Sequence, residues 1–251
     1  MSRLSCFLFE RAVLRLCQRT ARAVDPAPAA GWLTDRVGII VDIPSPGVPL
    51  EFGPAGRPAI VLVHDWYGRL PWLEAYADGL VHAGFSVLVP DLYDGRATAD
   101  EDSAEELMRD LDLAFALSTI ADSVQQARAA GAPRVGLIGF SLGGWLALLE
   151  GQAGTVDAIA AYYATVAPDD HGVVPCPVLL NFAEEDEWGD GEEPEEFIGR
   201  LKEHGTPVVS YSYPGTVHSF ANASIPSKLS SHAAALAFAR TASFLKAQLI
   251  D

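Results

Sequence analysis

The sequence RVGLIGFSLGGWLALLE, residues 134–150, joins a strand pattern to a helix pattern through a short glycine-rich turn. Residues 135–140 form an apolar run, and an amphipathic helix is expected directly after Ser141. Residues 139–143 fit the pattern G-x-S-x-G, a sharp turn that lifts a serine hydroxyl off the end of a sheet. The glycines are needed because a Cβ on either side would collide with the neighbouring strand or helix. An ordinary glycine-rich turn is the alternative, and the flanking strand and helix patterns favour the elbow.

Strand and helix patterns alternate on both sides of this stretch. Strands are expected at residues 37–43, 50–52, 59–64, 85–90, 134–140, 156–163, 177–183 and 207–213. Helices are expected at residues 71–83, in one or two segments of 100–130, after 141, and at 194–204 and 230–249. This alternation predicts an α/β fold with a doubly wound, mostly parallel sheet and helices on both faces. The short segment 50–52 is expected to pair back on the strand 37–43 as an antiparallel edge strand.

Length and composition favour a single domain and exclude some partners. A chain of 251 residues with 49% hydrophobic content can bury one large core. The formal net charge of −16 argues against nucleic acid or an anionic membrane surface as a partner, because phosphate binding needs a basic face. No apolar run approaches the length of a spanning helix, so no stable membrane insertion is expected. The sequence leaves the oligomeric state open.

The three cysteines are Cys6, Cys17 and Cys176, and they show no metal-ligand or C-x-x-C spacing. No metal site is therefore expected. A sparse and odd number of cysteines suits free thiols in a reducing compartment, which predicts a cytoplasmic location.

The N-terminal segment differs from the acidic remainder of the chain. Residues 1–24 hold five arginines and a single acid, Glu10. We expect an appended, partly ordered helix without a catalytic role, followed by a proline-containing linker at residues 23–31. A targeting or surface-binding segment and an extension from a misplaced start codon are the alternatives. Residues 1–31 are thus assigned to an extension and linker, and residues 32–251 to the domain.

Ser141 needs a base and an acid, since a serine hydroxyl is a poor nucleophile on its own. In a sheet with this elbow the acid and then the histidine follow the serine, each just past a later strand. His218 lies in the loop after the last expected strand and before the final helix. The acid must come from residues 184–187, EEDE, after the strand 177–183. Loop length favours Asp186, and Glu185 is the alternative.

Two backbone N–H groups are needed to hold the negative oxygen that forms during attack. One is expected from Leu142, which follows the nucleophile and begins its helix. The other is expected from the loop after the strand that ends at His64, at Trp66 or its neighbour.

Six blocks of sequence resemble the dienelactone hydrolase family of α/β-hydrolases. They are HDWYG at 64–68, AGF at 83–85, PDLY at 90–93, GFSLGG at 139–144, AEED at 183–186 and HSF at 218–220. The match runs in order from about residue 37 to residue 249. It implies a compact α/β-hydrolase fold without a large lid and a catalytic triad of Ser141, Asp186 and His218. It also implies that Trp66 is the second oxyanion donor.

The sequence departs from the best-known members of this family at the nucleophile, which is cysteine in those members. A glutamate in the loop after the second core strand helps to hold that thiol, and Asp65 occupies the matching position here. A thiolate can be formed in advance and a serine alkoxide cannot, so His218 must take the proton during attack. Asp65 is then expected only to shape its loop.

A second departure concerns the substrate. In lactonases of the family, arginines hold the carboxylate of the dienelactone. Arg96 matches one of them, but Asn222 stands where another would be. Losing one cation weakens selection for an anionic substrate, because guanidinium contacts carry much of carboxylate recognition. The candidate residues of the substrate pocket are Asp65, Tyr93, Arg96 and Asn222.

The sequence therefore predicts a serine hydrolase that cleaves a small carboxylic ester or lactone through an acyl-enzyme, without a metal or organic cofactor. One alternative is a catalytically silent α/β-hydrolase that binds a ligand or a partner. Another is an acyltransferase or perhydrolase that uses the same triad with a different acceptor.

Overall fold

The computed structural model describes residues 41–42, 48–187 and 193–251. The predicted extension and linker, residues 1–31, lie outside the described residues, as do Cys6 and Cys17. The start of the predicted domain, residues 32–40, lies outside them as well.

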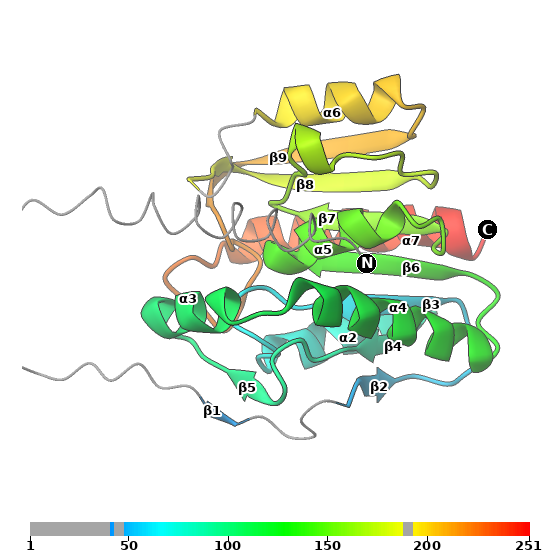
Figure 1. Ribbon diagram of the computed structural model, residues 1–251, viewed down its shortest axis with the longest axis horizontal. Helices are drawn as coiled ribbons and strands as arrows, with labels where there is room; N and C mark the ends of the chain where they lie inside the picture. The colour runs from blue at the N-terminus through cyan, green and yellow to red at the C-terminus, as the bar shows by residue number, and fades with distance from the viewer. Residues whose placement is uncertain (1–40, 43–47, 188–192) are drawn as a thin grey trace, which may run out of the picture.

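A seven-stranded sheet with the order β2-β4-β3-β6-β7-β8-β9 forms the centre of the molecule (Figure 1). Its strands are β2 (Leu50–Phe52), β3 (Ala59–Val63), β4 (Ser86–Val89), β6 (Val135–Phe140), β7 (Ala158–Tyr162), β8 (Val178–Glu185) and β9 (Val208–Val217). Edge strand β2 runs antiparallel to β4, and the other neighbouring pairs are parallel. The predicted α/β class, the mostly parallel sheet and the antiparallel edge are confirmed.

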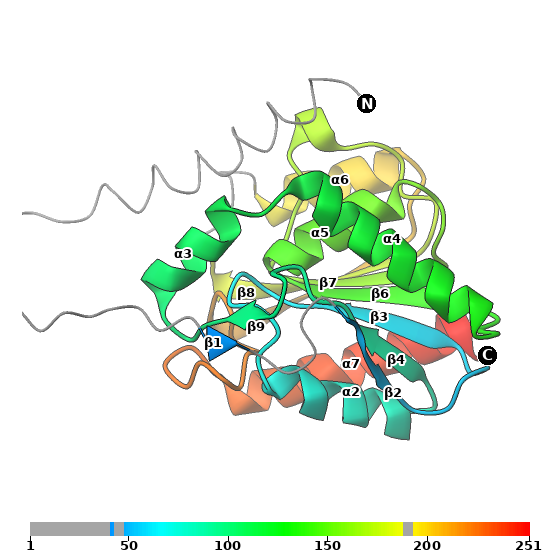
Figure 2. The ribbon, with the colours of Figure 1, turned by 60° about the horizontal axis from the view of Figure 1, so that its bottom comes forward.

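Helices cover both faces of this sheet. They are α2 (Trp72–His82), α3 (Glu101–Arg109), α4 (Leu113–Ala129), α5 (Leu142–Gly151), α6 (Pro194–Glu203) and α7 (Ser231–Leu249). Figure 2 shows α2 and α7 on one face and α4, α5 and α6 on the other. Strands β3, β4, β6 and β7 are buried along their whole length between these layers, which explains why their sequences are continuous apolar runs.

The segment 100–130, predicted as one or two helices, forms two. Asp100 and Asp112 each lie before a helix and accept a hydrogen bond from a backbone N–H in its first turn, from Ser103 and Phe115 respectively. An aspartate at the N-cap supplies an acceptor to N–H groups that have none inside the helix. The second cap, three residues after Arg109, separates α4 from α3.

Two short strands form a separate antiparallel pair, β1 (Val41–Asp42) with β5 (Arg96–Ala97). The predicted strand 37–43 is described only at residues 41–42, and it pairs with β5 and not with β2. A 3-10 helix, η1 (Pro168–Asp170), follows β7. Neither β5 nor η1 was predicted, because two or three residues are too few to show a hydrophobic period.

Strands β8 and β9 extend beyond their predicted ends at residues 183 and 213. They continue to Glu185 and Val217, which pair with each other after an irregularity in the ladder. Side chains of these last residues are largely exposed, so the apolar pattern ends before the hydrogen-bonded ladder does. The loops that carry the predicted acid and histidine therefore begin later, and closer together, than the hydrophobic pattern indicates.

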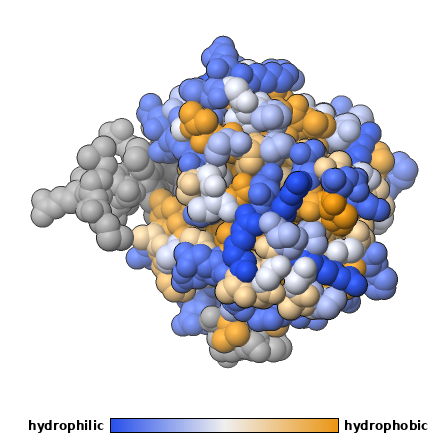
Figure 3. Space-filling view, turned by 90° about the vertical axis from the view of Figure 1, so that its right-hand side faces the viewer, coloured by the Kyte–Doolittle hydropathy of each residue, from blue (hydrophilic) through white to orange (hydrophobic). Residues whose placement is uncertain are grey.

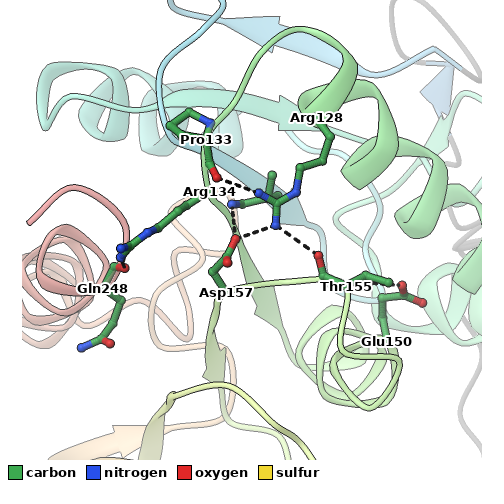
Figure 4. Close-up of polar contacts among 8 residues, drawn as sticks. Arg128, Pro133, Arg134, Glu150, Thr155, Asp157 and Gln248 are labelled. Carbon is green, nitrogen blue, oxygen red and sulfur yellow. Dashed lines mark hydrogen bonds and ion pairs between the residues drawn. The ribbon is translucent and has the colours of Figure 1, made fainter.

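The edge where the parallel strands begin, here called the amino edge, holds an ion pair between Arg128 of α4 and Asp157, the residue before β7. Arg128 Nη2 donates to Asp157 Oδ2 over 2.6 Å and also reaches the carbonyl of Thr155 (Figure 4). The same carboxylate oxygen accepts the backbone N–H of Val135 over 2.7 Å, and the Arg128 Nη1 donates to the carbonyl of Pro133. Figure 3 views the molecule from this side, where hydrophilic residues lie between separate hydrophobic patches.

None of the helices in the described ranges is both long enough and apolar enough to cross a membrane.

Candidate active site

Ser141 lies between β6 and α5 with φ 51° and ψ −115°, a backbone conformation that side-chain-bearing residues rarely adopt. The glycines around it allow close backbone approach. A Cβ on Gly139 would lie 2.1 Å from the carbonyl oxygen of Gly143, and a Cβ on Gly143 would lie 2.3 Å from that of His64. The predicted steric role of these glycines is confirmed, since one faces the helix after Ser141 and the other the end of β3.

Ser141, His218 and Asp186 form a continuous chain of hydrogen bonds. Ser141 Oγ lies 2.7 Å from His218 Nε2, and His218 Nδ1 lies 2.8 Å from Asp186 Oδ1. With its proton on Nδ1, His218 donates to the carboxylate and leaves Nε2 to accept the serine hydroxyl. The histidine is buried and the serine partly exposed, so a substrate can reach the hydroxyl while the base stays shielded.

The register of β8 and β9 explains why Asp186 meets His218. Glu185 and Val217 are the last residues of the two strands and pair with each other. Asp186 and His218 directly follow them. The neighbouring acid Glu184 accepts the backbone N–H of Gly215 over 2.6 Å. Glu185, the alternative acid, belongs to the ladder of β8, and the carboxylate that bonds His218 is that of Asp186.

The two predicted oxyanion donors lie on adjoining stretches of backbone. Leu142 is the first residue of α5, so its N–H has no acceptor within the helix and points along the positive end of the helix dipole. Trp66 lies three residues after the end of β3, and β3 pairs with β6 so that Val63 is opposite Gly139. The loop after β3 therefore starts level with the elbow.

Tyr163 is a site residue that sequence reasoning missed. It follows β7 with φ 39°, and its ring centroid lies 4.9 Å from that of His218. Its side chain is buried, and burial raises the pKa of its hydroxyl well above the usual value, which keeps the group neutral. A tyrosine directly after a strand was its only signal, and apolar strand ends commonly carry one without any function.

Asp65 and Asn222, two predicted pocket residues, contact each other. Both side chains are fully buried, and Asn222 Nδ2 donates to Asp65 Oδ2 over 2.8 Å. The second carboxylate oxygen of Asp65 accepts the backbone N–H of Tyr67, and Asn222 Oδ1 accepts that of Ser224. Burial raises the pKa of Asp65 to about 7. The hydrogen bonds that its carboxylate accepts from Asn222 and Tyr67, and the charge of Lys228, oppose this shift.

The other two pocket candidates lie after β4. Tyr93 is buried, and its hydroxyl has no hydrogen-bond partner within the part of the chain that the structure describes. Arg96 is exposed, belongs to β5, and donates from Nε to the carbonyl oxygen of Tyr93. The structure therefore separates one exposed candidate, Arg96, from three buried ones.

Among the described residues, no three histidine, cysteine, aspartate or glutamate side chains form a group that could hold a metal ion. Cys176 is buried, and burial raises the pKa of its thiol to about 11, so it is a poor nucleophile at neutral pH.

Comparison with known proteins identifies the family of this chain. The model of the dienelactone hydrolase family matches residues 50–249. This chain belongs to the dienelactone hydrolase family. A carboxymethylenebutenolidase of Rhodococcus opacus is 30% identical to it over 210 residues, which are 76% of this chain and 81% of the relative. The protein usf of Aquifex pyrophilus is 26% identical over 182 residues, 66% of this chain and 78% of the relative.

Solved structures support the fold of this dienelactone hydrolase family member. A dienelactone hydrolase-like promiscuous phosphotriesterase from metagenomic libraries superposes with a TM-score of 0.68 at 19% identity, covering 78% of this chain and 88% of that one. The resemblance found in the sequence and the α/β-hydrolase fold it implied are thus confirmed. Membership of the family makes the protein a hydrolase of the carboxylic ester and lactone class.

Proposed function

We propose that this dienelactone hydrolase family member is a serine hydrolase that cleaves a small carboxylic ester or lactone through an acyl-enzyme. The observation that carries the proposal is the chain of hydrogen bonds from Ser141 Oγ through His218 to Asp186, at 2.7 and 2.8 Å. Nucleophile, base and orienting acid are already within hydrogen-bond reach of one another, as general-base activation of a hydroxyl requires.

In the proposed reaction, Ser141 Oγ attacks the carbonyl carbon while His218 Nε2 takes the hydroxyl proton. The carbonyl oxygen becomes an oxyanion, which the N–H groups of Leu142 and Trp66 hold. The tetrahedral intermediate collapses, the bond to the leaving oxygen breaks, and His218 returns the proton to that oxygen. Asp186 stabilises the imidazolium throughout. Water then attacks the acyl carbon and gives a proton to His218. The bond from that carbon to Ser141 Oγ breaks, His218 returns the proton to Oγ, and the carboxylic acid leaves.

The substrate that we propose is an ester or lactone without a free carboxylate. Asn222 is neutral and donates to Asp65, so this position offers a substrate no cation. The nearby cation Lys228 lies 2.6 Å from the carboxylate of Glu101. The net charge of −16 also disfavours an anionic ligand.

Replacement of Ser141 by alanine tests the nucleophile. The wild-type protein is expected to hydrolyse short p-nitrophenyl esters and to be labelled by a fluorophosphonate probe. Ser141→Ala is expected to lose labelling and to lose turnover by a factor on the order of 10⁴ or more, because triad members act as a unit. Ser118→Ala, on the surface of α4, provides a matched control that should behave as wild type. Labelling that persists in Ser141→Ala would contradict the assignment.

The wild-type protein also tests the alternative functions that the sequence leaves open. A wild-type protein that reacts with no serine-directed probe but binds a ligand tightly would be a silent member of the fold. Product analysis with water, an alcohol or peroxide as acceptor would identify an acyltransferase or a perhydrolase. A set of matched esters and lactones, with and without a carboxylate, tests the substrate class. A strong preference for the carboxylate-bearing members would overturn the proposed role of Asn222.

A further inference from the structure

Two loops that the proposed reaction needs follow strands that are not neighbours in the sheet. The oxyanion loop, residues 64–68, follows β3, and the histidine loop, residues 218–225, follows β9. Strands β6, β7 and β8 lie between them, so no shared ladder of hydrogen bonds sets one loop against the other. A direct contact between the two loops is therefore needed to fix the distance between the proposed oxyanion donor and the proposed base.

The hydrogen bond from Asn222 to Asp65 provides that contact. We infer that the buried Asp65–Asn222 pair is a positioning device that fixes the oxyanion loop against the histidine loop. Each partner is anchored in its own loop by a second hydrogen bond, Asp65 to the N–H of Tyr67 and Asn222 to that of Ser224. The inference rests on the proposed function, since it assigns a role in the same reaction.

Burial makes this contact stronger than a second connection between the two regions. Both side chains of the pair are fully buried, so an unmade bond would leave a polar group without water or partner. The second connection runs through Glu101 of α3, which reaches Tyr67 Oη over 3.4 Å and Lys228 Nζ over 2.6 Å. Its carboxylate is more than half exposed, and exposed ion pairs contribute little.

The pair lies next to the reacting groups in sequence as well. Trp66, the proposed oxyanion donor, directly follows Asp65, and His218 precedes Asn222 by four residues. A shift of one loop would move the donor away from the oxyanion while leaving the pocket able to bind substrate. We therefore expect the pair to affect kcat and not KM, because only transition-state contacts depend on it.

The chemistry of the pair allows a reciprocal exchange. In Asp65→Asn, two amides face each other, and one hydrogen bond of the set is lost whichever way they turn. In Asn222→Asp, a second carboxyl group replaces the amide donor, so above the pKa of Asp65 two negative charges face and repel each other. The double variant Asp65→Asn/Asn222→Asp restores all three bonds, since residue 65 still accepts from Tyr67 and now donates to residue 222, which still accepts from Ser224.

The test measures kcat and KM on p-nitrophenyl butyrate together with the thermal midpoint of each variant. Each single variant is expected to lose about 10- to 100-fold in kcat, the cost of misplacing a group by around 1 Å, with KM nearly unchanged. The double variant is expected to recover most of that loss. Asp157→Asn at the amino edge is the matched control, because it also removes a carboxylate that accepts a backbone N–H, and its kcat should equal that of wild type.

Asn222→Ala removes the bond without adding a donor or a charge, and gives the same readout should Asp65→Asn fail to fold. Single variants with wild-type kcat, or a double variant no better than the singles, would overturn the inference and leave the proposed function intact. A wild-type protein without esterase activity or probe labelling would overturn both.

Discussion

Each edge of the sheet holds an aspartate that accepts one backbone N–H and one side-chain N–H from a different element. At the amino edge, Asp157 accepts from Val135 and Arg128. At the opposite edge, where the parallel strands end, Asp65 accepts from Tyr67 and Asn222. The first carboxylate is about one-third exposed and faces a permanent cation, while the second is fully buried and faces a neutral amide.

The difference between the two carboxylates lies in their surroundings, and it supports a structural role for Asp157 and the proposed positioning role for Asp65. Water and a guanidinium stabilise the charge of Asp157, so its contact joins α4 to the sheet at low cost. Asp65 lacks both, and burial raises its pKa to about 7. A protein that only needed to fold would gain little from such a group, because replacing buried polar pairs with apolar residues is often stabilising.

Residues with positive φ also differ between the two edges of the sheet. The turns that lead from helices into parallel strands place glycine at the positions with positive φ, at Gly84, Gly131, Gly154 and Gly205. Among the described residues, those with positive φ that are not glycine all follow strands: Asp94, Ser141, Tyr163 and Ser219. Such conformations cost on the order of 1–3 kcal/mol each and are typical of functional sites.

The largest expected contrast lies within a single strand, β6. A Cβ on Gly139 meets the backbone of Gly143 at 2.1 Å. A Cβ on Gly136 meets the tips of the Leu249 and Ile60 side chains at 2.9 and 3.2 Å, and its nearest backbone atom, the Ala158 carbonyl oxygen, is 3.3 Å away. Side-chain tips can move and the backbone of the elbow cannot. Gly136→Ala is expected to cost about 1–3 kcal/mol in free energy of unfolding, as overpacking usually does. Gly139→Ala is expected to cost more than about 4 kcal/mol, in the exceptional range.

Urea unfolding followed by circular dichroism measures both free energies. Equal losses of unfolding free energy in the two variants would mean that the elbow can shift to accept a Cβ. The expected contrast between the two edges would then be wrong.

The buried carboxylate gives the next largest effect, on the pH dependence of stability. The pKa of Asp65 is about 7 in the folded protein and 3.8 in an unfolded chain. Between these values the folded state holds a proton that the unfolded state has lost, so this group makes stability fall as pH rises from about 4 to 7. The slope is at most about 1.4 kcal/mol per pH unit. Asp65→Asn is expected to remove that slope.

Unfolding free energies of wild type and Asp65→Asn at several pH values between 5 and 7 provide the measurement. The difference between the two proteins should change steadily across this range. Parallel curves would show that Asp65 is ionised in the folded protein throughout, with Asn222 and Lys228 outweighing its burial.

The smallest expected effect concerns strain at the nucleophile. Ser141 has φ 51°, which glycine adopts without steric cost. Ser141→Gly and Ser141→Ala are both expected to be inactive, but the glycine variant should be more stable than the alanine variant by about 1 kcal/mol. Differential scanning calorimetry of the two variants checks this. A glycine variant less stable than the alanine variant would show that the flexibility of the unfolded glycine chain outweighs the strain at the elbow.

The sequence allows most of the sheet to be predicted. Strands β3, β4, β6 and β7 are covered on both faces, and continuous apolar runs report that burial directly. The ends of β8 and β9 escape prediction because their last ladder residues, such as Glu185 and Val217, are largely exposed. Hydrogen bonds of the backbone leave no mark on side-chain chemistry, so this part of the fold appears only in three dimensions.

The candidate triad is predictable because each member follows a strand that is itself predictable. The choice among residues 184–187 rests on loop length and on the family resemblance, and the pairing of Glu185 with Val217 supplies the physical reason for it. The contact between Asp65 and Asn222 has no such signal. Its partners are 157 residues apart and on loops of non-adjacent strands, where no local period connects them. The cytoplasmic location and the role of residues 1–31 stay predictions.

The strand order also sets the sequence of events during synthesis. From β6 onward, each new strand joins the previous one on the same side of the sheet, in the order in which the ribosome makes them. Ser141 arrives with β6, Asp186 with β8 and His218 only with β9, shortly before the final helix. Since chains fold from the N-terminus as they emerge, a nascent chain carries the proposed nucleophile long before the proposed base. If the proposed triad is correct, a nascent chain gains hydrolytic activity only after β9 has joined the sheet.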